Sequence, residues 1–196
     1  MPMEQTAPRL RLFIAVEAPP AVKGAAVQVI DRLRGRGDVR WVEPDRLHLT
    51  LKFLGDSSPE KLPQLTEILE ENANIFSRFV VELGDVGAFP NLRRPQTIWL
   101  GVERAEGLSR LAEEIDRAVC KLGFEREARS FRAHLTLGRV KSSQGLGALA
   151  DALRAGAGCP AGIEWPIEDV ELIRSELRPT GPLYTILHRF PLRRSE

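Results

Sequence analysis

The amino-acid sequence predicts an α+β fold in which antiparallel sheets are flanked by helices. Short apolar runs that end at turn residues alternate with stretches in which apolar side chains recur at helical spacing. Several predicted strands follow one another directly through short turns, which favours antiparallel pairing over a parallel doubly wound sheet. The order strand, helix, motif strand, helix, strands is found in both halves of the chain. We therefore expect one bilobal domain over residues 1–196, with two pseudo-symmetric lobes around a central cleft.

Periodicity and turn residues place the individual elements. Apolar and β-branched runs bounded by glycine, proline and charged residues predict strands. In chain order these strands cover residues 10–16, 47–54, 79–86, 97–102, 131–140, 167–177 and 183–190. Apolar stripes at helical spacing predict helices over residues 22–33, from 57–60 to 76, over 108–122 and over 146–153. The last two strands are expected to pair around a turn at residues 179–182.

The start of the second helix has two interpretations. Ser57 and Glu60 have the spacing of a capping box, in which each side chain bonds the other's backbone N–H. Alternatively, Ser58 is the cap and Pro59 occupies the first helical position, where its missing N–H costs nothing. The sequence does not choose between them.

Composition argues against a strong overall charge, a disulfide framework and a membrane span. The 28 Lys and Arg residues nearly balance the 27 Asp and Glu residues, so any steering of an anionic ligand has to be local. The two cysteines, Cys120 and Cys159, have neither metal-type spacing nor the density of a disulfide framework, which fits a reducing compartment. The first eight residues lack a signal pattern, and no apolar run reaches membrane-spanning length. We expect a soluble, cytoplasmic protein with no membrane association, and nothing calls for more than a monomer.

The tetrapeptide His-Leu-Thr-Leu occurs twice, at residues 48–51 and 134–137, and contains two of the three histidines. Because strand side chains alternate between faces, His48 and Thr50 share one face while the leucines occupy the other. The same holds for His134 and Thr136. If the two halves are related by a pseudo-two-fold axis, the two His–Thr pairs converge across the cleft.

Two histidines facing one cleft suit phosphoryl chemistry without a metal. One neutral imidazole would take a proton from the attacking oxygen while the other, protonated, gives one to the leaving oxygen; each contributes about 10²–10⁴-fold. The threonine hydroxyls would bond the charged phosphate oxygens. The two imidazoles need different pKa values for these roles. A zinc site is the rival interpretation, but there is no third His or Cys at useful spacing, and threonine is a poor zinc ligand. We expect no metal and no cofactor.

Segments around both motifs resemble the 2′-5′ RNA ligase family, the RNA 2′,3′-cyclic phosphodiesterases of the two-histidine phosphoesterase superfamily. The similarity covers nearly the whole chain and lies in residues 11–16, 41–42, 47–55, 131–139, 175–177 and 181–184. One departure is Ala133, where the family commonly has proline before the second histidine.

The resemblance implies a bilobal α+β fold and metal-independent hydrolysis of the 2′,3′-cyclic phosphate end of RNA, or of a cyclic nucleotide, to a 2′-phosphate. It also implies a weak, reversible 2′-5′ joining of tRNA halves, as in some members. By position, His48 would protonate the departing 3′ oxygen, His134 would activate water, and Thr50 and Thr136 would hold the phosphate. Which histidine is acid and which is base stays open. Two alternatives also remain: a nucleotide or RNA-end binding module, and a phosphodiesterase for another small cyclic or 2′-5′-linked phosphodiester.

Four further residues are candidates for substrate binding. Arg139 matches an arginine usual in the family and would contact the phosphate or the terminal base; otherwise it is a surface residue. Phe13 would stack on a base, a contact worth roughly 1–3 kcal/mol, or belong to the core. Lys52 and Arg132 are in phase with the histidines if both strands stay regular, and would then add positive charge to the cleft; otherwise they are solvated strand-end residues.

Overall fold

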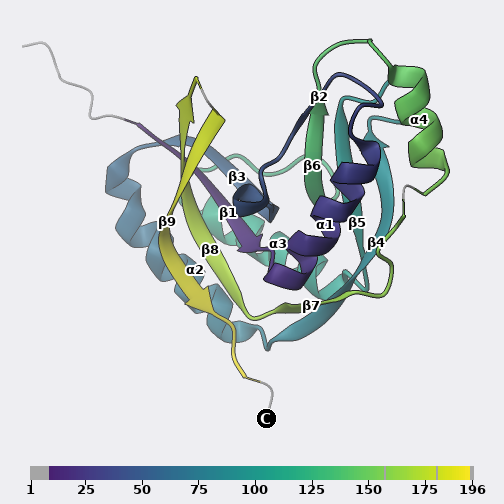
Figure 1. Cartoon of the computed structure of the whole chain (residues 1–196). Helices are drawn as coiled ribbons and strands as arrows, with labels where there is room; N and C mark the ends of the chain where they lie inside the picture. The colour runs from purple at the N-terminus through teal and green to yellow at the C-terminus, as the bar shows by residue number, and fades with distance from the viewer. Residues whose placement is uncertain (1–8, 157, 180, 195–196) are drawn as a thin grey trace, which may run out of the picture.

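The computed structural model describes residues 9–156, 158–179 and 181–194, which form two antiparallel sheets and four α-helices (Figure 1). One sheet has the strand order β3-β1-β8-β9, and the other has the order β2-β6-β5-β4-β7. The first sheet consists of β1 (Leu10–Glu17), β3 (His48–Ser57), β8 (Asp169–Arg178) and β9 (Gly181–Pro191). The second consists of β2 (Val39–Trp41), β4 (Phe79–Phe89), β5 (Thr97–Glu103), β6 (His134–Val140) and β7 (Glu164–Ile167).

The predicted α+β, two-lobed architecture with antiparallel sheets is confirmed. Every strand pairing in both sheets is antiparallel, and each sheet contains one motif strand, β3 or β6. The two halves of the chain are nevertheless interleaved. Strand β4 comes from the first half but pairs with β5 of the second sheet, and β8 comes from the second half but pairs with β1. This exchange ties the two lobes together through the backbone.

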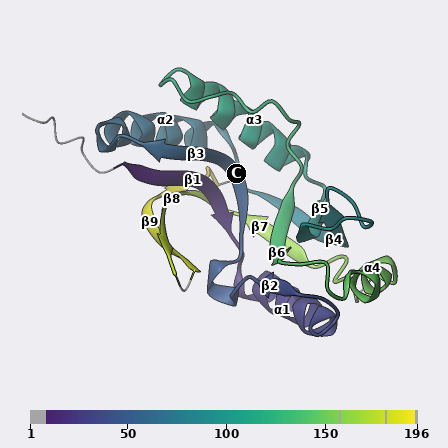
Figure 2. The same cartoon turned by 90° about the horizontal axis from the view of Figure 1, so that it is seen from above.

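The helices lie in two pairs on opposite flanks of the molecule (Figure 2). Helices α2 (Leu62–Ile75) and α3 (Glu106–Cys120) pack side by side, as do α1 (Pro20–Leu33) and α4 (Leu146–Arg154). Helix α3 also contacts β3, so the helix that precedes the second motif in the chain supports the first motif strand. No helix in the described part of the chain is long and apolar enough to cross a membrane.

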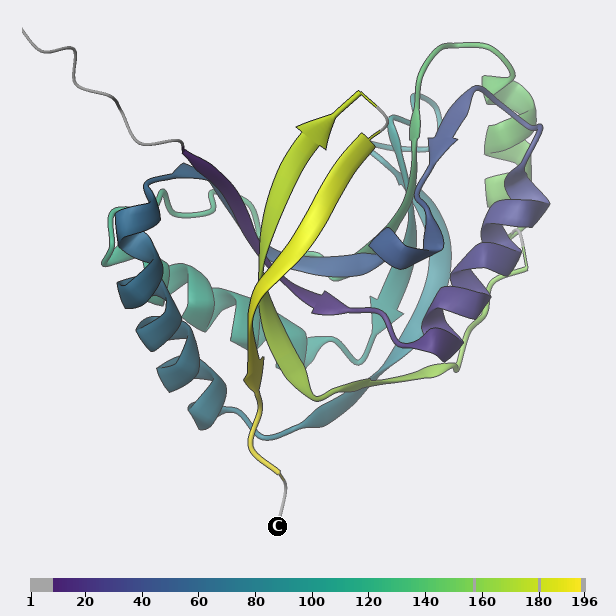
Figure 3. The same cartoon turned by 60° about the vertical axis from the view of Figure 1, so that its left-hand side comes forward.

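Three boundaries differ from the sequence-based expectation. The second helix is preceded by a 3₁₀ turn, Pro59–Lys61, and Ser58 caps that turn by accepting a hydrogen bond from Glu60 N at 3.4 Å, so Ser57 is not the cap. Strand β6 begins at His134 rather than at residue 131. The strand predicted over residues 167–177 corresponds to β8 and begins at Asp169, because Ile167 ends β7, a strand of the second sheet that was not predicted. Figure 3 shows the chain passing from β7 to β8 along the lower edge of the molecule. Residue 180 of the predicted turn lies outside the described residues.

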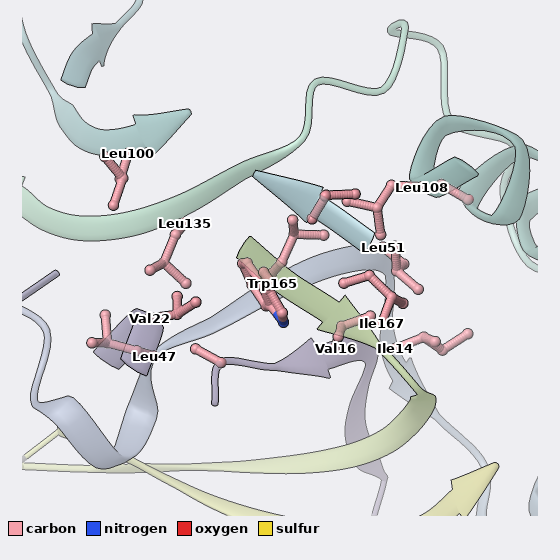
Figure 4. Close-up of a cluster of buried hydrophobic side chains, with 14 of the residues drawn as sticks. Ile14, Val16, Val22, Leu47, Leu51, Leu100, Leu108, Leu135, Trp165 and Ile167 are labelled. Carbon is pink, nitrogen blue, oxygen red and sulfur yellow. The ribbon is translucent and has the colours of Figure 1, made fainter. Parts of the chain in front are cut away.

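The leucines of both motifs belong to one continuous core. Leu49, Leu51, Leu135 and Leu137 are all buried in a cluster that contains side chains from both sheets and all four helices. Figure 4 shows side chains from opposite sheets, among them Leu51 and Leu135, pointing into the same interior around Trp165. Truncating one such leucine to alanine typically costs about 2–5 kcal/mol of stability. Burial of these leucines therefore fixes which face of each motif strand points into the core.

Candidate active site

The two motif strands meet at the seam between the sheets. Strand β3 is the edge strand of the first sheet, and it lies against β6 of the second (Figure 1). With the leucines buried, the histidine and threonine of each motif are partly exposed on the opposite face. The predicted pairing of His48 with Thr50, and of His134 with Thr136, on one strand face is confirmed.

A cavity of about 390 Å³ opens at this seam. His48 and Thr50 line it from β3, and Thr136 and Arg139 line it from β6. His134 lies on the same face of β6, two residues before Thr136. The remaining wall comes from β1, from the segment around Arg46 and from the β8–β9 hairpin, and includes Arg11, Phe13, Val42, Phe53, Ser175, Leu177, Pro182 and Tyr184. The lining contains no carboxylate, so the cavity is suited to an anionic ligand.

Both histidines are oriented by the same backbone hydrogen bond. His48 Nδ1 donates to the carbonyl oxygen of Arg46 at 2.7 Å, and His134 Nδ1 donates to that of Arg132 at 2.7 Å. A carbonyl oxygen only accepts, so Nδ1 carries the hydrogen in each ring. Nε2 is therefore the atom left to take or give a proton, and it occupies the same position relative to its strand in both halves.

Aromatic side chains hold each imidazole in place. The His48 ring lies 4.9 Å from the Phe13 ring and 5.2 Å from the Tyr184 ring, which it meets edge to face. The His134 ring meets Phe89 edge to face at 5.0 Å. Neither Tyr184 nor Phe89 was predicted to contact a histidine, because they come from β9 and β4, whose registers against the motif strands cannot be inferred from local pattern.

Burial lowers the pKa of both histidines below the ordinary value, against the backbone hydrogen bonds, which raise it. The pKa of His134 is lowered further by the positive charges of Arg132 and Arg139. No cation contributes to the shift of His48. The two copies of the motif are thus alike in geometry but differ in their electrostatic surroundings.

The expectation that Lys52 faces the cleft is wrong, because β3 does not stay regular. Ala15 pairs with Thr50 but Ile14 pairs with Lys52, so Leu51 is an extra residue that forms a β-bulge. Lys52 is turned to the other face, where it is 6% exposed and its Nζ lies 2.6 Å from Asp116 Oδ1. The lysine therefore supports the fold and does not line the cavity.

The bulge in β3 has a counterpart in β6. Trp99 pairs with Thr136 but Ile98 pairs with Gly138, so Leu137 is the extra residue. Beyond the bulge, Arg139 is directed into the cavity, where the sequence placed it. The bulge requires a small residue, because a Cβ at Gly138 would lie 2.8 Å from side-chain atoms of Trp41.

Phe13 and Arg132 differ from the expectation in other ways. Phe13 is only 3% exposed and offers almost no surface for stacking on a base; it packs beneath His48 and thus follows its core alternative. The exposed ring at this side of the cavity is Phe53, which is 61% exposed. Arg132 lies before the start of β6 and does not line the cavity; its guanidinium lies 5.0 Å from the Phe89 ring, which the His134 ring also meets.

The scaffold is an interleaved α+β fold in which two adjoining strands each carry a histidine and a threonine on one face, and His48, Thr50 and Thr136 line the cavity between them. This arrangement defines a two-histidine site of the phosphoesterase type. The chain belongs to the 2′-5′ RNA ligase superfamily, whose family model matches residues 19–179.

Individual relatives agree with this assignment. The chain is 38% identical over 181 residues to a protein of Archaeoglobus fulgidus named RNA 2′,3′-cyclic phosphodiesterase, covering 92% of this chain and 99% of that protein. The crystal structure of TT0787 of Thermus thermophilus superposes with a TM-score of 0.81 at 34% identity, over 95% of this chain and 100% of that one. The crystal structure of E. coli LigT complexed with 3′-AMP has a TM-score of 0.73 at 26% identity, over 94% of this chain and 98% of that one.

Proposed function

We propose that this protein hydrolyses the 2′,3′-cyclic phosphate end of RNA to a 2′-phosphate, as an RNA 2′,3′-cyclic phosphodiesterase. One observation carries the proposal: two His–Thr pairs, whose histidines are oriented by equivalent backbone hydrogen bonds, come from strands that adjoin at one cavity with no carboxylate in its described lining. The name of the Archaeoglobus relative and the 3′-AMP bound by E. coli LigT support the substrate class.

His134 is the better candidate for the general base. Its pKa is lowered by burial and also by the charges of Arg132 and Arg139, which keeps the imidazole neutral near pH 7. Nε2 would take a proton from water as the water oxygen forms a new bond to phosphorus. The same site would accept a 5′-hydroxyl in place of water, which yields the weak 2′-5′ ligation expected from the resemblance.

His48 would be the general acid. It would give its Nε2 proton to the 3′ oxygen as the bond between that oxygen and phosphorus breaks. Burial alone lowers its pKa, so the bound anionic phosphate has to stabilise the protonated ring. The hydroxyls of Thr50 and Thr136 would donate to the non-bridging oxygens, where negative charge builds up in the transition state. Arg139 would neutralise the same charge from the cavity wall.

A short RNA ending in a 2′,3′-cyclic phosphate tests the proposal directly. The reaction is run with EDTA present, and ³¹P NMR identifies the position of the phosphate in the product. The proposal predicts turnover to a 2′-phosphate. A 3′-phosphate product would reverse the assignment of the leaving oxygen, and binding without turnover would make the protein an RNA-end binding module.

A further inference from the structure

Four arginines form a cationic rim at the cavity: Arg11, Arg40, Arg46 and Arg139. Three of them line the cavity, and Arg40 is the direct cross-strand partner of Arg139 between β2 and β6. Within the described residues, none of these four guanidinium groups has a salt-bridge or hydrogen-bond partner. Like charges gathered without carboxylates repel one another and favour a bound anion.

Other described arginines, such as Arg93, Arg94 and Arg110, also lack a side-chain partner, but the rim gathers four of them at one cavity. Arginines are also found paired with carboxylates: Arg189 pairs with Glu17 and Glu171, and Arg104 pairs with Glu82. The chain as a whole is almost balanced in charge, so carboxylates are not scarce. None of the described carboxylates lines this cavity, so the positive charge of the rim is not neutralised there.

Two of the rim arginines are brought together by the β8–β9 hairpin. A Cβ built on Gly181 would lie 2.6 Å from Arg46 Nη1 and 2.8 Å from Arg40 Nη2, so both guanidinium groups pack against this glycine. The two nitrogens are no farther apart than the sum of these distances. Gly181 has a φ of 122°, a conformation that favours glycine, and the missing side chain leaves room for the pair.

The charges of three rim arginines also reach the floor of the cavity. Burial raises the pKa of Tyr184, and the charges of Arg139, Arg46 and Arg11 act against that rise. Tyr184 in turn contacts His48 edge to face, so these arginines lie around a residue that packs on the proposed reaction centre. Two exposed apolar side chains also line the cavity: Phe53 is 61% exposed and Leu177 is 73% exposed.

A cavity lined by both cationic and exposed apolar side chains matches a nucleic-acid strand, which presents both phosphates and bases. The cyclic phosphate itself would occupy the His–Thr pairs. A nucleoside 2′,3′-cyclic phosphate has no second anion for Arg40 and Arg46. An RNA strand has one, in the phosphodiester on the 5′ side of its terminal nucleotide.

We propose that Arg40 and Arg46, held side by side against Gly181, form a second phosphate subsite that binds the phosphodiester 5′ to the terminal nucleotide of RNA. This inference rests on the proposed function and adds the substrate length: the enzyme selects RNA strands over mononucleotides. Phe53 and Leu177 provide the apolar surface for the bases of the bound strand. The Arg40–Arg46 pair contributes to strand selection and takes no part in proton transfer.

Three substrates with the same terminal base show whether the second anion that binds is an internal phosphodiester or a free 5′-phosphate. They are adenosine 2′,3′-cyclic phosphate, its 5′-phosphorylated form, and the dinucleotide ApA ending in a 2′,3′-cyclic phosphate. The measured quantity is the ratio of kcat/KM for each longer substrate to that for the first. A high ratio for the dinucleotide is expected. If only the 5′-phosphorylated form shows it, the subsite binds a free terminal phosphate, and the strand-selection proposal is overturned.

The variant Arg40→Gln/Arg46→Gln is expected to lower the dinucleotide ratio about tenfold or more, because two charge-assisted contacts are lost. Arg110→Gln is the matched control: Arg110 is an exposed arginine on α3, outside the cavity lining, and its removal should leave the ratio unchanged. An unchanged ratio in the double variant overturns the inference. If the double variant does not fold, the single variant Arg40→Gln, at an exposed residue, should still lower the dinucleotide ratio about twofold or more. An unchanged dinucleotide ratio in this single variant would also overturn the inference.

A binding measurement keeps this test separate from the proposed function. If the wild-type protein hydrolyses none of the substrates, the proposed function fails. Fluorescence anisotropy with a labelled RNA 4-mer ending in a 2′-phosphate then tests the subsite alone. The double variant should bind more weakly and show a smaller dependence of affinity on salt concentration, because fewer counterions are released. Equal affinity and equal salt dependence would overturn the subsite.

Discussion

Phe53 and Arg139 occupy equivalent positions in the two halves of the protein. Each follows its motif threonine by three residues, and each is directed into the cavity by a bulge at the intervening leucine. The duplicated backbone therefore carries an aromatic ring on one side of the cavity and a guanidinium on the other. The two motifs are alike, and the difference between the sides of the site begins immediately after them.

Replacing Arg139 should change both rate and pH dependence. Arg139→Gln removes a phosphate contact, so kcat/KM should fall about tenfold or more. It also removes a charge that lowers the pKa of His134, so that pKa should rise. If His134 is the base, activity is lost as pH falls through its pKa, and the acid limb of the kcat/KM profile moves to higher pH. An acid limb that stays in place or moves to lower pH would remove His134 from the role of base.

The buried pair Lys52–Asp116 should matter for stability. Lys52→Met removes the buried cation nearest the Asp116 carboxylate, which is 14% exposed and keeps only the Glu127 N–H and the more distant Arg126, so it should cost about 3 kcal/mol of unfolding free energy. The control is Arg154→Met, because the Arg154–Asp151 pair is solvent-exposed and should contribute less than about 1 kcal/mol. Urea denaturation measures both. Equal losses in the two variants would show that burial does not distinguish the pairs.

Gly138 should tolerate no side chain, whereas Gly24 should. A Cβ at Gly138 would clash with Trp41 and Val39 side-chain atoms at 2.8 Å, so Gly138→Ala should destabilise the protein by about 1–3 kcal/mol. Gly24 lies inside α1 with nothing within 4 Å of its added Cβ, so Gly24→Ala should stabilise by about 0.4–1 kcal/mol. Thermal unfolding gives the sign of each change. A stabilising Gly138→Ala would mean that the bulge does not need the glycine.

Much of this arrangement could be predicted from the sequence, and the remainder could not for physical reasons. Alternation placed His48 with Thr50 and buried the leucines behind them, because a half-buried strand has a period of two. The same rule misplaced Lys52, because a bulge adds one residue to the strand and reverses the faces beyond it. Nothing local distinguishes Leu51 from a regular strand residue; the bulge depends on how β1 pairs with β3.

Contacts between distant segments also could not be predicted from the local sequence pattern. The exchange of β4 and β8 between sheets, and the approach of the β8–β9 hairpin to Arg40 and Arg46, depend on packing of the whole chain. Arg139 was found because it follows a motif at a spacing known from the family. Arg40 and Arg46 have no such marker.

The two lowered histidine pKa values should make stability depend on pH in a defined direction. In the unfolded chain both imidazoles titrate near pH 6.5, and in the folded protein they titrate below it. The unfolded state therefore binds more protons in that interval, so the contribution of the histidines is present above about pH 6.5 and is lost as pH falls through the folded pKa values. The unfolding free energy of wild type minus that of His48→Gln/His134→Gln should decrease on acidification from pH 7.5 to about 5.

Subtraction of the double variant isolates the histidines from other groups. Burial raises the pKa of Glu171 and of Asp169, and these carboxyls act in the opposite direction as pH falls. They are present in both proteins and cancel in the difference. A difference that grows on acidification would contradict the lowered histidine pKa values.

Single-turnover hydrolysis of an RNA ending in a 2′,3′-cyclic phosphate, in the presence of EDTA, measures the central claim most directly. His48→Ala and His134→Ala should each lower the rate about a hundredfold or more, because each removes one general acid–base group. Both variants should keep a cooperative unfolding transition, since neither ring is part of the main hydrophobic core. A wild-type rate in either variant would contradict the two-histidine account.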